Sequence, residues 1–459
     1  MFNKTFFTSL ALLSLLADQR LSADELAVLK SKPMTFVGVA SCTATNCHGG
    51  RGKSGGEATH WLQFDAKHRQ AFDVLLSDRS RSMAVKLGIR EAHTDSRCLA
   101  CHTTNAGKTN VAHGERFSLE FGVGCEACHG PAGDWLSAHT QKSWRTLSDL
   151  QKAELGFRDL QSATNRADAC AVCHVGSESA TVDHDLIAAG HPRLTFELAA
   201  YHSMLPKHWN AREELQRDPM QEVRLWAIGQ ATTAKVTTEI SRARAQAALD
   251  KQSDRVATDL AEFDCHSCHH DLAEESWRVN RWSLGKLGAP QWGTWNVYSA
   301  VWLAKNGRLP GANLSDAGVE TSFIELQKLM QSSRLGTVRA EPLLMASRQA
   351  NAALRRWQLD IESAKLDQAT VKDLQRLLLL ESSDNEWLPT WDGYAQRLLA
   401  ISAVNSATHA TGNNTLVNGN PISSPLLPLR ERLRYPRDYA TPHRLIPAEV
   451  DELFRQLRP

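Results

Sequence analysis

Five pairs of cysteines, each followed at once by a histidine, organise this chain of 459 residues. Four of the pairs have the spacing C-x-x-C-H, and one has four residues between its cysteines. Together they use all ten cysteines of the chain. The motifs, numbered first to fifth in chain order, are Cys42/Cys47/His48, Cys98/Cys101/His102, Cys125/Cys128/His129, Cys170/Cys173/His174 and Cys265/Cys268/His269.

The C-x-x-C-H spacing is typical of covalent haem attachment. Two thiols bond to the vinyl groups of the porphyrin, and the histidine imidazole binds the iron from one side. Disulfides or zinc sites would also use cysteine pairs, but neither explains a histidine after every pair. With 18 histidines in the chain, five such coincidences have a probability on the order of one in ten million, so the spacing favours haem. The sequence therefore predicts five covalently attached haem c groups, with iron bound by the five motif histidines.

The first 23 residues have the pattern of a secretory signal peptide. Lys4 precedes an apolar run from Phe6 to Ala17, and Ser22-Ala23 follow as small residues. The run has about a dozen residues, fewer than the roughly 20 that a membrane-spanning helix needs. We expect cleavage near Ala23 and a periplasmic protein without a transmembrane anchor. The formal charge of +1 gives no reason to expect a nucleic-acid partner.

The spacing of the motifs suggests how the chain is organised. Successive motifs are separated by 49, 22, 40 and 90 residues, too few in the short gaps for each haem to have its own core. We expect a mainly α chain with little regular sheet, in which porphyrins share walls and supply much of the buried apolar surface. Helical periodicity is expected over 59–87, 218–250, 352–380, 391–401 and 447–457. The predicted units are a signal peptide (1–23), a pentahaem cytochrome c domain (24–275) and a helical C-terminal domain of unknown role (276–459).

The flanks of the motifs resemble those of the cytochrome c-554 family, tetrahaem electron carriers, and of related larger multihaem cytochromes. The resemblance rests on GVGCEACHGP at Gly122–Pro131 followed by His139, on DAKHRQAF around His68, and on CLACHTTNAG and CAVCHVG in the second and fourth motifs. It covers about residues 36–210. The wider first motif, the fifth motif and the long C-terminal region depart from the family, so the chain is expected to be an enlarged pentahaem relative.

Thirteen histidines outside the motifs could supply the second axial ligands of the irons. The resemblance implies His68 and His139 as two of them. His184 and His191 lie seven residues apart in DHDLIAAGHPRL, about two helical turns, and are predicted as two more. His270 directly follows a motif histidine, and is either a ligand of a different haem or a surface residue. The remaining candidates, held in reserve, are His60, His93, His113, His202 and His208.

In the family the second haem lacks a second protein ligand, so the resemblance implies an open face at Cys98–His102 unless His93 or His113 closes it. We expect a carrier that relays electrons between a donor and an acceptor protein through five haems. One alternative is an oxidoreductase in which a five-coordinate haem acts on a small nitrogen or sulfur oxyanion. The other is a subunit of a respiratory complex, docked through the C-terminal region.

Overall fold

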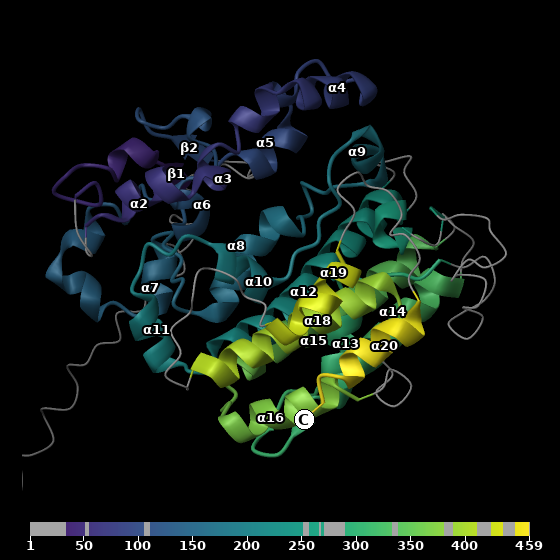
Figure 1. Ribbon diagram of the computed structural model, residues 1–459. Coiled ribbons are helices and arrows are strands. Elements are labelled where there is room, and N and C mark those ends of the chain that lie inside the picture. The colour runs from purple at the N-terminus through teal and green to yellow at the C-terminus, as the bar shows by residue number, and fades with distance from the viewer. Residues whose placement is uncertain are drawn as a thin grey trace, which may run out of the picture.

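The structure is a computed structural model that describes residues 34–50, 55–104, 111–250, 257–265, 268–269, 290–332, 338–380, 389–410, 424–434 and 446–458. Most of these residues lie in helices or in the loops between them (Figure 1). Within this part of the chain the named strands form two small sheets. One is a parallel pair of β1 (Met34–Phe36) and β2 (Val111–His113), and the other an antiparallel pair of β3 (Arg308–Leu309) and β4 (Ala312–Asn313). The prediction of a mainly α chain is confirmed.

The N-terminal part, purple to blue-green in Figure 1, consists of short helices joined by loops. Over 59–87 the sequence predicts two helical pieces, and the structure has three α-helices and a 3-10 turn. Breaks occur where Asp65 and Ser77 cap new helices, because their side chains accept backbone N–H groups of the following turn. The α-helices of this part are α2 (Glu57–Phe64), α3 (Ala66–Arg69), α4 (Asp78–Lys86), α5 (Ser96–His102), α6 (Cys125–His129), α7 (Asp149–Glu154), α8 (Ala163–His174), α9 (His184–Ala189), α10 (Leu198–Met204) and α11 (Ala211–Arg217).

The longest helix, α12 (Gln221–Leu249), lies at the centre of the main hydrophobic core. It packs against α8 and α10 on one side and against helices of the C-terminal region on the other. Its central turns are buried all round, as expected for a helix enclosed by neighbours. Buried threonines are tolerated because their hydroxyls bond within the helix: Thr233 donates to the Gly229 carbonyl at 2.7 Å, and Thr237 to the Thr233 carbonyl at 2.9 Å.

The C-terminal region is a bundle of longer helices, green to yellow in Figure 1. The run expected over 352–380 is divided in two, since Asp367 caps a new helix by accepting the Thr370 N–H at 2.8 Å. Before the break, the Arg224 guanidinium of α12 donates to the last carbonyls of the preceding helix. The helices are α13 (Tyr298–Asn306), α14 (Ala317–Ser332), α15 (Ala340–Ser363), α16 (Gln368–Leu378), α18 (Trp391–Ala410), α19 (Leu427–Arg432) and α20 (Pro447–Arg455).

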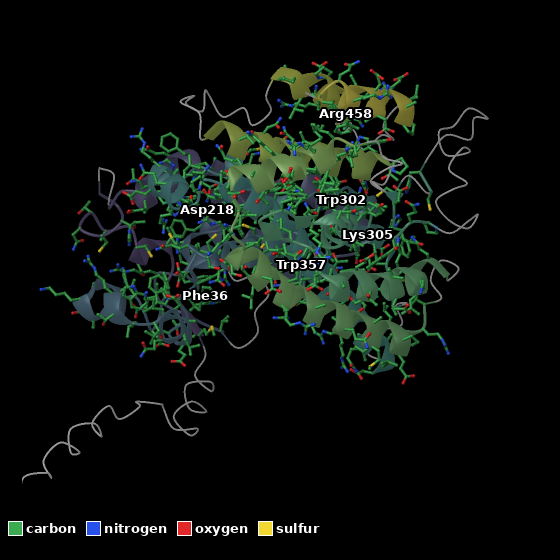
Figure 2. The ribbon with its side chains drawn as sticks, turned by 90° about the horizontal axis from the view of Figure 1, so that it is seen from below. Phe36, Asp218, Trp302, Lys305, Trp357 and Arg458 are labelled. Carbon is green, nitrogen blue, oxygen red and sulfur yellow. The ribbon has the colours of Figure 1, made fainter. Side chains whose placement is uncertain are left out.

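One hydrophobic core runs across the domain boundary that the sequence suggests near residue 275. Trp226 of α12 and Trp357 of α15 are both buried in it, and the Trp357 indole N–H donates to the Leu314 carbonyl at 2.9 Å. Trp302 is buried in the same core, and Figure 2 shows Trp302 and Trp357 among these helices. The described residues of 163–263 thus share a core with the C-terminal helices, and the division into 24–275 and 276–459 stays a prediction.

A second, smaller apolar cluster lies in the N-terminal part and is built from Phe72, Leu75 and Ala92. None of the helices in the described residues is long and apolar enough to cross a membrane. The predicted signal peptide, Met1–Ala23, lies outside the described residues.

Candidate haem centres

Three of the five motifs lie at the C-terminal end of a helix. His102, His129 and His174 are the last residues of α5, α6 and α8. A helical turn suits the motif, since residues i, i+3 and i+4 share one face, which brings both thiols and the imidazole together. The fifth motif makes a similar turn, in which the His269 N–H donates to the Cys265 carbonyl at 2.8 Å.

The first motif holds its two additional residues in a wider loop. The His48 N–H reaches the Cys42 carbonyl at 3.2 Å, and a tight turn between them is closed by the Cys47 N–H on the Ala44 carbonyl at 2.9 Å. The loop still returns the histidine to the first cysteine, so the wide spacing preserves the local arrangement of the other motifs.

Two of the predicted attachment cysteines, Cys47 and Cys268, are exposed, whereas the other eight are buried or half-buried. At Cys268 the physical reason is local: the residue lies in a turn, held by its N–H on the Cys265 carbonyl at 3.2 Å, and not in a helix packed against the core. The thioether bond of Cys268 to haem stays a prediction that rests on the motif spacing.

The third motif is fixed by its flanking residues. Glu126, the first residue between its cysteines, is 3% exposed, and its carboxylate accepts the backbone N–H groups of Val37, Gly38 and Ala132 at 2.7–2.9 Å. Gly122 has a φ of +61°, and a Cβ there would lie 2.6 Å from the His68 carbonyl. The GVGCEACHGP stretch therefore joins the N-terminal segment to the helix that carries His68.

Each motif histidine faces one histidine from elsewhere in the chain. The ring centres of these five pairs are separated by 6.1 to 6.5 Å, although the partners are distant in sequence. The pairs are His48 with His139 (6.2 Å), His102 with His191 (6.5 Å), His129 with His208 (6.1 Å), His174 with His68 (6.2 Å) and His269 with His184 (6.4 Å).

This separation is the one that a metal held between two imidazoles requires. Metal–nitrogen bonds of about 2.0 Å on each side, extended by the short distance from each ring nitrogen to its ring centre, place the two ring centres roughly 6–7 Å apart. Rings in direct stacking lie closer, as His113 does against Phe117 at 4.0 Å. The five facing pairs therefore fit five irons, each between two histidines.

Backbone carbonyls orient several of these rings. An Nδ1–H that donates to a fixed acceptor leaves Nε2 available on the opposite side of the ring. The observed pairs of donor and acceptor are His102 with the Ala71 carbonyl (2.8 Å), His139 with the Trp135 carbonyl (3.2 Å) and His191 with the Pro192 carbonyl (2.8 Å).

Two further rings donate to carboxylates. His48 Nδ1 lies 3.0 Å from Glu57 Oε2, and His68 Nδ1 lies 2.8 Å from Asp65 Oδ2. Burial alone would raise the pKa of Asp65, but its hydrogen bond to His68 and the nearby imidazoles bring that pKa below its ordinary value. Both carboxylates are therefore ionised at neutral pH.

Burial keeps the most enclosed of the facing rings neutral. It lowers the pKa of His129 to about 4 and that of His174 to about 4. Burial also lowers the pKa values of His191 and His208. A neutral imidazole has the free lone pair that metal binding needs.

Motifs that are distant in sequence are neighbours in space. The Cys42 and Cys125 thiols are close enough that their interaction raises the pKa of Cys125 and lowers that of Cys42, so the first motif adjoins the third. The Cys101 and Cys173 thiols interact in the same way, which raises the pKa of Cys173, lowers that of Cys101 and places the second motif beside the fourth.

Two other links connect these pairs of motifs. Burial, together with the nearby Cys128, raises the pKa of Cys170 to about 12, which places the third motif beside the fourth. Helix α9 begins at His184 and ends just before His191, so one short element faces both the fifth and the second motif. In space, the five motifs therefore follow one another in the order first, third, fourth, second and fifth.

The predicted second ligands can be compared with these positions. His68, His139, His184 and His191 each face a motif histidine, whereas His270 lies outside the described residues. The fifth partner is His208, which faces His129 and which the sequence analysis held only in reserve, because no motif or periodicity distinguishes it.

The second motif departs from what the resemblance implies. His191 faces His102, where the family has no second ligand. The two reserve histidines that flank this motif do not face His102. His93 lies 3.5 Å from the Glu91 carboxylate, and His113 stacks on Phe117.

Comparison with known families agrees with this arrangement. Residues 41–130 match the model of the family described as cytochrome c554 and c-prime. This part of the chain is cytochrome c554-like. The match spans the first three motifs, and it implies covalently bound haem c and a role in electron transfer. Searches of curated proteins and of solved structures found no match.

Proposed function

We propose that this chain is a periplasmic pentahaem c-type cytochrome that relays electrons between a donor and an acceptor protein. The observation that carries the proposal is the set of five facing histidine pairs, each with one motif histidine and a ring separation of 6.1–6.5 Å. We assign His139, His191, His208, His68 and His184 as the second ligands of the first to fifth irons.

Each bound haem iron would supply a one-electron couple between its ferric and ferrous states. The two histidines of each facing pair would hold an iron between them, which would leave no coordination position for a substrate. Five motifs in one contiguous series give electrons a path with short steps and little rearrangement.

The alternative, an enzyme acting on a nitrogen or sulfur oxyanion, needs an iron with an open position. The resemblance points to the second motif for that role, and His191 faces His102 in that place. This observation favours the carrier over the enzyme.

The position of His191 is supported from both sides. Gly190, which has a φ of +125°, ends α9 directly before it. The Lys86 ammonium of α4 donates to the Ala189 carbonyl at 3.2 Å, and the Arg79 guanidinium donates to the Gly190 carbonyl. Cationic side chains on the last carbonyls stabilise the end of a helix.

Periplasmic location and partners rest on the sequence. The signal-peptide pattern of Met1–Ala23 supports export, which haem attachment outside the cytoplasm requires. The C-terminal helices share the core of α12, so their first role is to complete the fold around the fourth motif. Docking of a larger complex through this region remains the alternative role.

The test is the electron paramagnetic resonance (EPR) spectrum of the oxidised holoprotein. Five irons with two imidazoles each should give only low-spin ferric signals, unchanged by cyanide or nitric oxide. A high-spin signal that disappears on adding cyanide would reveal an open iron and support the enzyme.

A further inference from the structure

Two of the five histidine pairs have a carboxylate on the outer nitrogen of one ring. In the first pair it is Glu57, whose Oε2 lies 3.0 Å from His48 Nδ1. In the fourth pair it is Asp65, whose Oδ2 lies 2.8 Å from His68 Nδ1. In the first pair the carboxylate binds the motif histidine, His48, and in the fourth pair it binds the facing histidine, His68. The two contacts therefore belong to different local structures.

Glu57 is held by the start of α2. It is the first residue of that helix, and its second oxygen, Oε1, accepts the Gly55 N–H at 3.2 Å. The Glu57 side chain is 30% exposed. Both oxygens are therefore engaged, and the side chain is directed at the imidazole of the first motif.

Asp65 performs two tasks at once. Its Oδ1 accepts the backbone N–H of His68 at 3.4 Å and so caps α3, while Oδ2 receives the ring Nδ1–H of the same residue. The side chain is 13% exposed. The cap fixes the backbone and the ring of His68 together, which makes this contact shorter and drier than that of Glu57.

The second motif has a different environment. Both of its rings donate to neutral peptide oxygens, His102 to Ala71 and His191 to Pro192, each at 2.8 Å. This pair provides an internal reference, because its hydrogen bonds have similar lengths but no ionised acceptor.

A carboxylate acceptor makes an imidazole a stronger donor of electron density than a carbonyl does. A fixed negative charge close to a metal also favours its more positive oxidation state, and the effect grows as the surroundings become less polar. Both influences act in the same direction, towards the ferric state.

We propose that Glu57 and Asp65 are positioning residues that lower the reduction potentials at the first and fourth motifs relative to the second. The inference rests on the proposed axial ligands. Because Asp65 is less exposed and closer to its ring than Glu57, its influence is the larger of the two.

The variants Glu57→Gln and Asp65→Asn test this. Each keeps the side-chain shape and an acceptor oxygen but removes the charge, and asparagine also serves well as a helix cap. The holoproteins are titrated potentiometrically by visible absorption, and the five midpoints are obtained from Nernst fits. Each variant should raise one midpoint, and the rise in Asp65→Asn should reach about 59 mV, which is a tenfold change in the reduced-to-oxidised ratio at fixed potential for one electron. Asp65→Asn should give the larger change.

Asp95→Asn is the matched control. Asp95 caps α5 in the second motif and pairs with Arg97 at 3.0 Å, so the variant removes a charge near a haem without touching an imidazole. The midpoint shift in Asp95→Asn should be less than half of the shift in either of the other two variants. Equal shifts in all three variants would overturn the role of the ring hydrogen bonds, as would unchanged midpoints in Glu57→Gln and Asp65→Asn.

The EPR spectra of the same samples separate this inference from the proposed function. Low-spin signals in every variant, with unchanged midpoints, would refute the tuning role and leave the relay standing. High-spin iron in the unaltered protein would contradict the axial assignment, whatever the midpoints do. If Asp65→Asn does not accumulate, Asp65→Ser retains a capping oxygen without charge, and Glu57→Gln tests the inference independently.

Discussion

Replacing His191 by alanine should open the second iron and leave the other four unchanged. The His191 ring lies 6.5 Å from the His102 ring and is oriented by the Pro192 carbonyl. Without it, His102 would be the single protein ligand at this motif. Since one of five irons is affected, about one-fifth of the ferric haem should become high-spin, and cyanide should bind at one equivalent per chain instead of none.

The measurement is a quantitative EPR spectrum of oxidised holoprotein, combined with a cyanide titration followed by visible absorption. Haem content by mass spectrometry confirms that all five groups are attached. A new high-spin signal that integrates to about one-fifth of the haem, and that disappears at one equivalent of cyanide, is the expected result.

His93→Ala is the matched control, because His93 flanks the same motif but lies against Glu91 and Phe72. It should retain a purely low-spin spectrum. The reasoning fails if His93→Ala produces the high-spin signal, or if His191→Ala remains fully low-spin.

Three further predictions follow from other parts of the chain. Asp392→Ala removes both oxygens that the Arg193 guanidinium contacts at 2.9 and 2.8 Å, and should lower the free energy of unfolding in urea by about 3–5 kcal/mol. Glu449→Ala, in an exposed ion pair of α20, should lower the free energy of unfolding by less than about 1 kcal/mol. An equal loss in Asp392→Ala and Glu449→Ala would contradict the argument that burial makes the first ion pair important. The intact mass should include five haems, about 3 kDa, and serine at both cysteines of the first motif should reduce the count to four; four in the unaltered protein would exclude that motif. Burial raises the pKa of Glu197 from 4.5 to about 7. Its stabilising contribution is thus present below about pH 4.5 and lost as the pH rises to 7, so Glu197→Gln should remove about 3 kcal/mol of pH dependence from unfolding curves, and an unchanged pH profile would refute the shift.

Local features were the most predictable part of this chain. The thiol and imidazole positions follow from spacing, since a helical turn brings i, i+3 and i+4 together wherever the motif occurs. The long helix expected over 218–250 is confirmed as α12. The break near residue 364 was not foreseen, because it depends on the Asp367 cap and on an arginine from another helix. Spacing also says nothing of exposure, and the structure places Cys47 and Cys268 at exposed positions.

Long-range pairing was less predictable. His208 faces His129 across 79 positions of the chain, and its neighbours carry no periodic pattern. Its ring lies against that of Trp209 at 5.4 Å between ring centres, and the Trp209 indole donates to Glu214 at 2.6 Å. The cysteine positions also say nothing of the hydrophobic core, which joins α12 to helices of the C-terminal region beyond residue 275.

The thiol contacts between motifs have a consequence for maturation. The Cys42 and Cys125 thiols influence each other's pKa, as do those of Cys101 and Cys173, so each of these free thiols has a close neighbour in a different motif. In an oxidising compartment such neighbours join readily as disulfides. A chain that folded before it received its porphyrins would therefore risk cross-linking the wrong sulfurs and blocking four of its five attachment sites. If the proposed function is right, thioether bonds should therefore form on an extended, reduced chain before it compacts.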